Sequence, residues 1–215
     1  MLNAWIAGAS GLVGGELIAL LLADPEFARV TSVARRTLPL LPSDSKLAQV
    51  TVDFADPKSF ASLPAADVAF SCLGTTLKKA GSPAAFRAVD LDAVSTFAAA
   101  ARAHGATTFV HVSSLGANSQ SSQLYLRTKG EIEEKVAALG FTSVYALRPS
   151  FLDGGDRKRP ETRVAERIAL SVARVIKPIL GKYKPTTTVA TARVMIEKAK
   201  ERAAGNHIVE ANEIA

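Results

Sequence analysis

Short apolar runs alternate along the chain with segments in which apolar residues recur at helical spacing. A run that ends at Gly8 predicts a buried strand, and the pattern from Glu16 to Leu22 predicts a helix directly after it. The same patterns predict further strands over 29–34, 49–54, 67–73, 108–113, 143–147 and 207–210, and helices over 83–103, 125–139, 164–176 and 189–203. Strand-then-helix units in succession predict an α/β fold with a doubly wound parallel sheet and helices on both faces.

The turn between the first strand and the first helix is rich in glycine. Gly8, Gly11 and Gly14 are spaced by three, as in the phosphate-binding turn of a Rossmann dinucleotide fold. Free N–H groups and the helix dipole favour an anion at that helix start. The turn predicts cofactor contacts from Gly8, Ala9, Ser10, Gly11, Leu12, Val13 and Gly14. A glycine-rich turn without a ligand is the alternative.

Charged residues after the second and third strands bear on which dinucleotide binds. Arg35 and Arg36 follow the second strand, where an acidic residue would bind the ribose of NAD and an arginine would accommodate the 2′-phosphate of NADP. NADP(H) is therefore favoured over NAD(H), the alternative being two solvated loop arginines. Asp53 stands where an adenine ring could rest, although a turn-capping aspartate is the stronger reading. Leu73 ends the fourth strand, and Gly74 and Thr75 follow it at the ligand-binding edge, so all three are predicted to contact the cofactor.

Residues suited to proton transfer follow the fifth strand. Ser113 and Ser114 end that strand, and Tyr125 and Lys129 lie four apart on the next helix, so they share one face. A phenol is a poor acid at pH 7, and a neighbouring ammonium favours its ionised form. A serine hydroxyl beside them can hydrogen-bond a carbonyl. These four residues predict carbonyl reduction, with the hydride coming from a nicotinamide.

These motifs together resemble the short-chain dehydrogenase/reductase superfamily in its atypical branch, and within it the family of the human Tat-interactive protein and its bacterial relatives. The closer likeness lies in 72–76, 113–117, 124–126, 129–131 and 148–149. It implies an NADPH-binding Rossmann fold with Tyr125 and Lys129 as the catalytic pair. It also implies that Lys129 holds the nicotinamide ribose and that Pro149 and Leu152 flank the nicotinamide.

The chain departs from that family pattern at two places. Asp90 stands where extended members usually carry an asparagine, which weakens any proton relay through that position. Ser113 and Ser114 lie twelve and eleven residues before Tyr125, a slightly short connection. Which serine faces the substrate therefore stays open, with Ser114 preferred.

Composition narrows the class of protein. The 215 residues, 48% of them apolar, predict a single NAD(P)-binding domain over 1–215, with a substrate-lid segment at about 150–190. Neither a membrane span nor a presequence is expected. The single cysteine, Cys72, allows no intramolecular disulfide, which favours a reducing, cytoplasmic compartment. Cys72 itself is expected to be a small core residue. The net charge of +6 includes basic residues over 157–184, which form either a lid for an acidic substrate or a solvated face. Nucleic-acid binding is not expected, and three scattered histidines, His111 among them, predict no metal site.

Three functions fit this sequence. The first is an NADPH-dependent oxidoreductase that reduces a small carbonyl substrate with Tyr125 as proton donor. The second is an NADPH-binding regulatory or scaffold protein with a protein partner. The third, for which the chain is short, is a nucleotide-sugar epimerase or dehydratase. A homodimer formed through the helices over 83–104 and 125–139 is consistent with the resemblance.

Overall fold

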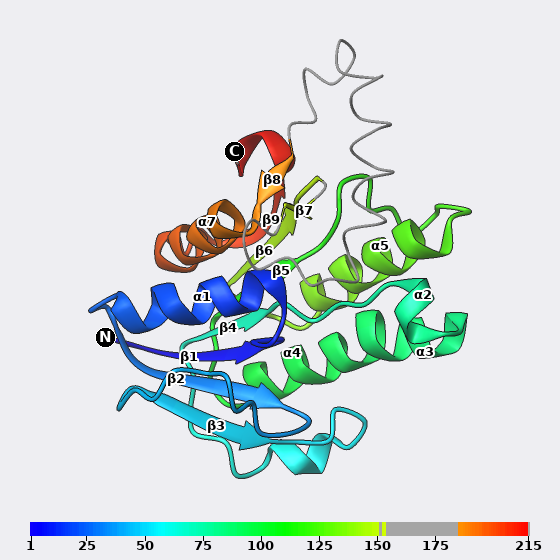
Figure 1. Cartoon of the computed structure of the whole chain (residues 1–215). Coiled ribbons are helices and arrows are strands. Elements are labelled where there is room, and N and C mark those ends of the chain that lie inside the picture. The colour runs from blue at the N-terminus through cyan, green and yellow to red at the C-terminus, as the bar shows by residue number, and fades with distance from the viewer. Residues whose placement is uncertain (151, 154–184, 215) are drawn as a thin grey trace.

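The fold is built on a parallel sheet whose strand order matches the predicted doubly wound topology. The structure is a computed structural model that describes residues 1–150, 152–153 and 185–214. Seven strands pair in the order β3-β2-β1-β4-β5-β6-β9, and every pairing is parallel (Figure 1). The strands are β1 (Leu2–Ala7), β2 (Phe27–Ala34), β3 (Leu47–Thr51), β4 (Val68–Ser71), β5 (Thr108–Val112), β6 (Ser143–Arg148) and β9 (Gly205–Glu210). The chain order reverses between β1 and β4, which creates a crevice at their carboxyl ends.

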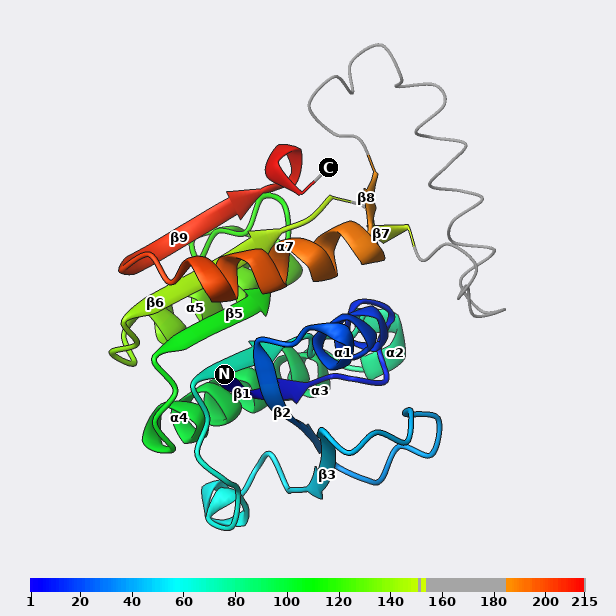
Figure 2. The ribbon, with the colours of Figure 1, turned by 90° about the vertical axis from the view of Figure 1, so that its left-hand side faces the viewer.

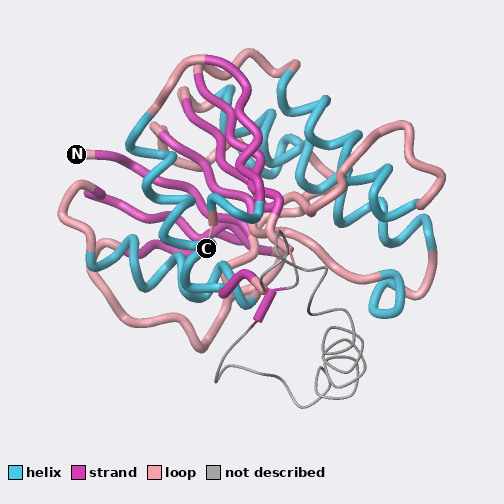
Figure 3. Tube along the Cα trace, turned by 90° about the horizontal axis from the view of Figure 1, so that it is seen from above, coloured by secondary structure: helices cyan, strands magenta, loops and turns pink. Residues whose placement is uncertain are grey.

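Helices cover both faces of this sheet, as the apolar patterns predict. The helices α1 (Leu12–Ala23) and α7 (Thr188–Glu201) pack on one face, and α4 (Val94–Ala103) and α5 (Leu124–Ala137) pack on the other (Figure 2). Seen from above, the strands lie between the two helix layers (Figure 3). Two cores result because side chains alternate along each strand. Ile6 and Phe70 belong to the α1–α7 core, whereas Trp5 and Phe109 belong to the α4–α5 core.

The helix predicted over 83–103 is interrupted. It starts at Pro83 as predicted, with the Ser82 hydroxyl capping the N–H of Ala85 at 3.1 Å. It then runs as α3 (Pro83–Arg87), a π-helical segment η2 (Ala88–Ala93) and α4. A π-helical segment places an extra residue in the turn and often marks a functional site. The turn carries Asp90, which is fully buried.

Other boundaries also differ from the prediction. β3 ends at Thr51, not at Phe54, so Asp53 lies in the following turn and its carboxylate accepts the N–H of Ala55 at 2.9 Å. The 3-10 helix η1 (Pro57–Phe60) follows this turn. A short unpredicted helix, α2 (Leu77–Ala80), begins after Thr76, whose hydroxyl caps it. The 3-10 helix η6 (Ala211–Glu213) follows β9.

Two short strands lie beside the predicted substrate-lid segment. The strands β7 (Leu152–Asp153) and β8 (Thr186–Thr187) pair in parallel, and the N–H of Ser150 donates to the Thr186 hydroxyl at 3.2 Å. The predicted helix over 164–176 and the basic segment over 157–184 lie outside the described residues. Of the helices that the structure describes, none has the length and apolar character needed to cross a bilayer.

Candidate cofactor and active site

The glycine turn brings β1, β4 and α1 together at the carboxyl edge of the sheet. Gly8 has a φ of +88°, and a Cβ atom there would lie 2.5 Å from the carbonyl of Cys72. A Cβ atom on Gly14 would lie 2.2 Å from the Gly8 oxygen, so neither position accepts a side chain. The N-cap residue of α1, Gly11, has no side chain to cap the helix, and the first turn of α1 holds no acidic residue. This helix start therefore offers backbone N–H groups and a positive dipole end to an anion.

A pocket of about 430 Å³ opens beside this turn. Its lining joins the carboxyl ends of β1, β2 and β4, and consists of Gly8, Ala9, Ser10, Val33, Ala34, Arg35, Arg36, Leu38, Phe54 and Leu73. Arg35 and Arg36 are exposed and share this pocket with the glycine turn, as the NADP interpretation requires. Phe54, not Asp53, is the lining residue from the loop after β3. Sequence reasoning missed Phe54, although its place at the end of an apolar run was a usable signal.

Cys72 has the structural role predicted for it. Its thiol points into the α1–α7 side of the molecule, where Sγ lies 3.9 Å from Sδ of Met195. Burial raises the pKa of this thiol to about 12, so the reactive thiolate is scarce at neutral pH.

The two serines after β5 have different surroundings. Ser113 is buried, and its hydroxyl donates a short hydrogen bond to the Glu133 carboxylate. Arg148 holds the same carboxylate through two bonds, Nε to Oε1 at 3.0 Å and Nη2 to Oε2 at 2.6 Å. Ser114 is half-buried, and its hydroxyl makes one weak contact of 3.4 Å to the Leu115 oxygen.

Arg148 also anchors the carboxyl end of β6. Its Nη1 lies 3.1 Å from Oε1 of Glu210, and the Glu133 and Glu210 carboxylates together raise the pKa of the Arg148 guanidinium. The next residue, Pro149, accepts the N–H of Leu115 at 3.1 Å. The segment that carries Ser114 is thereby tied to the end of β6. Leu152, in β7, packs on the α1–α7 core.

Tyr125 and Lys129 lie one helical turn apart at the start of α5. Tyr125 is 36% exposed, and its ring packs on that of Phe86 with the ring centroids 5.8 Å apart. Lys129 is only 4% exposed, and its Nζ lies 2.8 Å from Oδ1 of Asp90. The other oxygen of Asp90, Oδ2, accepts the N–H of Thr75 at 2.8 Å. The position that departs from the family pattern thus forms a buried ion pair with the predicted catalytic lysine.

A glycine in α5 sets the path between the serines and Tyr125. A Cβ atom on Gly130 would lie 2.1 Å from the Ser119 nitrogen and 2.3 Å from the Asn118 carbonyl carbon. The loop from Ser114 therefore lies directly on the helix, where the N–H of Asn118 donates to the Leu126 oxygen at 3.1 Å. This close contact accommodates the short connection between the serines and Tyr125.

His111, two residues before Ser113, is buried on β5. Burial and the nearby positive charge of Lys129 lower the pKa of its imidazole to about 3, so the ring is neutral at pH 7. Within the part of the chain that the structure describes, Nε2 of His111 has no hydrogen-bond partner. No group of three or more metal-ligating side chains gathers among those same residues.

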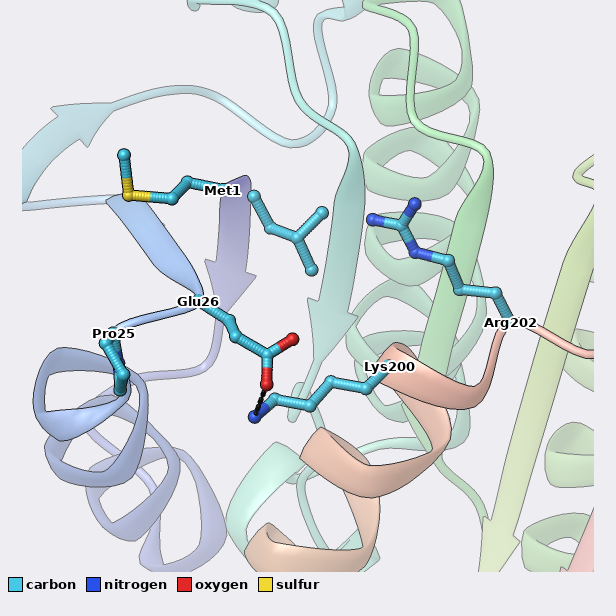
Figure 4. Close-up of a pocket in the computed structure, with 6 residues that line it drawn as sticks. Met1, Pro25, Glu26, Lys200 and Arg202 are labelled. Atoms are coloured by element: carbon cyan, nitrogen blue, oxygen red, sulfur yellow. Dashed lines mark hydrogen bonds and ion pairs between the residues drawn. The ribbon is translucent and has the colours of Figure 1, made fainter.

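A second pocket, of about 440 Å³, lies at the opposite, amino-terminal edge of the strands, between the start of β1 and the end of α7. Lys200 within it pairs with Glu26 at 2.7 Å, as the dashed line in Figure 4 shows, and with Asp24 at 2.5 Å. None of the predicted site residues lines this pocket.

Comparisons with known proteins agree with this geometry. A sequence model of the NAD(P)H-binding family matches residues 8–176. "Protein FMP52, mitochondrial" of Candida albicans is 32% identical over 207 residues, covering 93% of this chain and 89% of that protein. "Protein HTATIP2" of Rattus norvegicus is 40% identical over 152 residues, covering 70% of this chain and 62% of that protein. The cytoplasmic location expected from the sequence is contradicted, because the FMP52 relatives are named as mitochondrial proteins.

Solved structures share the fold at low sequence identity. MoeE5 in complex with UDP-glucose and NAD has a TM-score of 0.74 at 18% identity, covering 99% of this chain and 79% of that chain. A short chain dehydrogenase family protein from Francisella tularensis has a TM-score of 0.72 at 14% identity, covering 99% and 98%. The resemblance drawn from the sequence motifs is confirmed. The chain belongs to the NAD(P)H-binding family and has the Rossmann-type fold of the short-chain dehydrogenases/reductases.

Proposed function

We propose that this protein is an NADPH-dependent oxidoreductase that reduces a small carbonyl compound. One observation carries the proposal: Ser114, Tyr125 and Lys129 are presented at the carboxyl side of the sheet, on the same side as the glycine turn. In an open α/β sheet, ligands bind in the crevice at that side. A proton donor and a cofactor held there together provide both parts of a reduction.

The cofactor residues follow from the pocket and the turn. The segment Gly8–Gly14 would hold the pyrophosphate, and Arg35 with Arg36 would pair with a 2′-phosphate. Leu73, Gly74 and Thr75 would lie along the dinucleotide, Lys129 would hold the nicotinamide ribose, and Pro149 and Leu152 would flank the nicotinamide. Asp53 is left out of this set because its carboxylate caps its own turn.

Each active-site residue has a separate task in the reduction. When bound, NADPH supplies the hydride that forms the new C–H bond at the carbonyl carbon. Tyr125 gives its phenolic proton to the carbonyl oxygen, and solvent later restores that proton. Lys129 stabilises the phenolate by its positive charge. Ser114 donates a hydrogen bond to the carbonyl oxygen, whereas Ser113 is occupied by Glu133.

The proposal is tested by NADPH oxidation against a panel of aldehydes, ketones and quinones, with NADH run in parallel. Tyr125→Phe is expected to lower turnover by about 100-fold or more, since general acid catalysis contributes that much. NADPH affinity, measured by calorimetry, should stay close to that of the wild type. Full turnover in Tyr125→Phe would contradict the proposal. Tight NADPH binding without turnover on any substrate would favour the regulatory function.

A further inference from the structure

The buried pair of Asp90 and Lys129 joins three elements behind the proposed active site. Asp90 lies in η2 and is 0% exposed, and Lys129 lies in α5 and is 4% exposed. The third element is the turn after β4, which reaches Asp90 through the N–H of Thr75. A Cβ atom on Gly74 would lie 3.4 Å from Oδ1 of Asp90 and 3.7 Å from Nζ of Lys129. The three elements therefore meet around one carboxylate.

The charges around Lys129 leave Asp90 as its counterion. A buried ammonium is strongly unfavourable unless a partner compensates its charge. His111 comes from the neighbouring strand β5 but is neutral at pH 7, because burial and Lys129 lower the pKa of its imidazole. Among the residues that the structure describes, Asp90 supplies the one carboxylate paired with Lys129. An asparagine at position 90 would supply no such charge.

We propose that Asp90 is a positioning residue that couples the turn at Gly74–Thr75 to the ammonium of Lys129. One carboxylate oxygen fixes the backbone of the turn, and the other fixes the direction of the lysine side chain. Cofactor bound against this turn thus meets a lysine that is already in place. The inference rests on the proposed function for the placement of NADPH against Lys129, but it does not require turnover.

The first experiment measures NADPH affinity by calorimetry, without substrate. Asp90→Asn keeps an amide oxygen for Thr75 but removes the charge that holds Lys129. It is expected to weaken NADPH binding about tenfold, within the range typical of coupling between sites. Asp92→Asn is the matched control, because Asp92 belongs to the same π-helical segment but is exposed; it should leave affinity unchanged. Wild-type affinity in Asp90→Asn would overturn the proposal.

A double-mutant cycle separates positioning from a merely structural role. If Asp90 acts through Lys129, Lys129→Met lowers NADPH affinity in the wild type but has little further effect in Asp90→Asn. If Asp90→Asn and Lys129→Met lower NADPH affinity by factors that simply multiply in the double variant, the two residues act independently, and the proposal is overturned. Where Asp90→Asn alone does not fold, the double variant D90N/K129M removes both charges. It should fold and bind NADPH no more weakly than Lys129→Met, and weaker binding would count against the coupling.

The outcome is independent of the test of the proposed function. Loss of the Tyr125 proton changes turnover, whereas the Asp90 experiments measure binding alone. A protein that binds NADPH, shows the Asp90 coupling and turns over no carbonyl would sustain this inference and refute the reductase. A protein that reduces carbonyls but whose NADPH affinity does not change in Asp90→Asn would support the reductase and refute this inference.

Discussion

At the scale of single residues, the two adjacent serines are separated by what each one touches. Ser113 belongs to a buried network in which Glu133 also binds Arg148, and Arg148 in turn reaches Glu210. Ser114 is half-buried, and its hydroxyl has no comparable partner among the described residues. The same residue type thus serves the fold at one position and remains available for chemistry at the next.

Alanine substitutions should separate these two roles. Ser113→Ala removes a buried hydrogen bond to a charged group and is expected to lower the free energy of unfolding by about 1 to 3 kcal/mol. Its kcat should change little. Ser114→Ala should leave unfolding nearly unchanged but lower kcat, because the carbonyl oxygen loses a donor. Denaturant unfolding and steady-state kinetics on both variants give the comparison, and the opposite pattern would exchange the assigned roles.

The two arginines after β2 carry a prediction about cofactor choice. A guanidinium pairs with a phosphate in a bidentate, charge-assisted manner, whereas a ribose hydroxyl gains little from it. The variant with both Arg35→Ala and Arg36→Ala should bind NADPH at least about tenfold more weakly and NADH almost as before. Calorimetry with both cofactors measures this. An equal loss for NADPH and NADH would show that the arginines do not read the 2′-phosphate.

At the scale of elements, the apolar pattern predicted the strands and helices that bury an apolar face. It did not predict features that depend on pairs of polar side chains far apart in the sequence. The central strands and α1, α5 and α7 follow from apolar spacing, because each buries one or both faces. The π-helical segment η2 does not, since its signal is a single aspartate that pairs with Lys129, which lies 39 residues further along the chain in α5. The role of Ser113 was hidden for the same reason: Glu133 lies twenty residues further along the chain. Phe54 reached the pocket because β3 ended earlier than its apolar pattern indicated.

The contact between α5 and the loop before it predicts an unusually sensitive glycine. Gly130→Ala would place a methyl group against the backbone of Asn118 and Ser119, closer than any real Cβ contact, so this backbone would have to shift. We expect a loss of unfolding free energy above about 3 kcal/mol, or failure to fold, as for an overpacked core. Gly140→Ala is the control, because Gly140 has open space around it and a φ of +75°. That control should cost about 1 to 2 kcal/mol, the penalty of the left-handed conformation alone. If Gly130→Ala and Gly140→Ala lower the unfolding temperature equally, the loop at Asn118 and Ser119 can move to accommodate the extra methyl group.

At the scale of the whole molecule, the two helix layers cover the faces of the sheet, and its carboxyl edge carries the proposed active site. The glycine turn, the pocket beside it and the Ser114 segment all lie there, while the pairs of Lys200 with Asp24 and Glu26 join α7 to the opposite edge. The side of the sheet that carries α4 and α5 also buries a histidine and an ion pair. Because the buried histidine, His111, has a lowered pKa, the free energy of unfolding depends on pH.

His111 provides the test of that dependence. Its pKa is lowered from 6.5 to about 3 in the folded protein, so between these values the unfolded chain binds a proton that the folded protein does not. Stability must therefore rise with pH across this window and fall as the solution is acidified, by at most about 1.4 kcal/mol per pH unit. We expect denaturant unfolding between pH 7 and 5 to show this slope in the wild type and to lose most of it in His111→Gln. His207→Gln, which removes a histidine from the edge strand β9, serves as the control. An unchanged slope in His111→Gln would show that folding does not lower the pKa of the His111 imidazole, contrary to the burial of this ring.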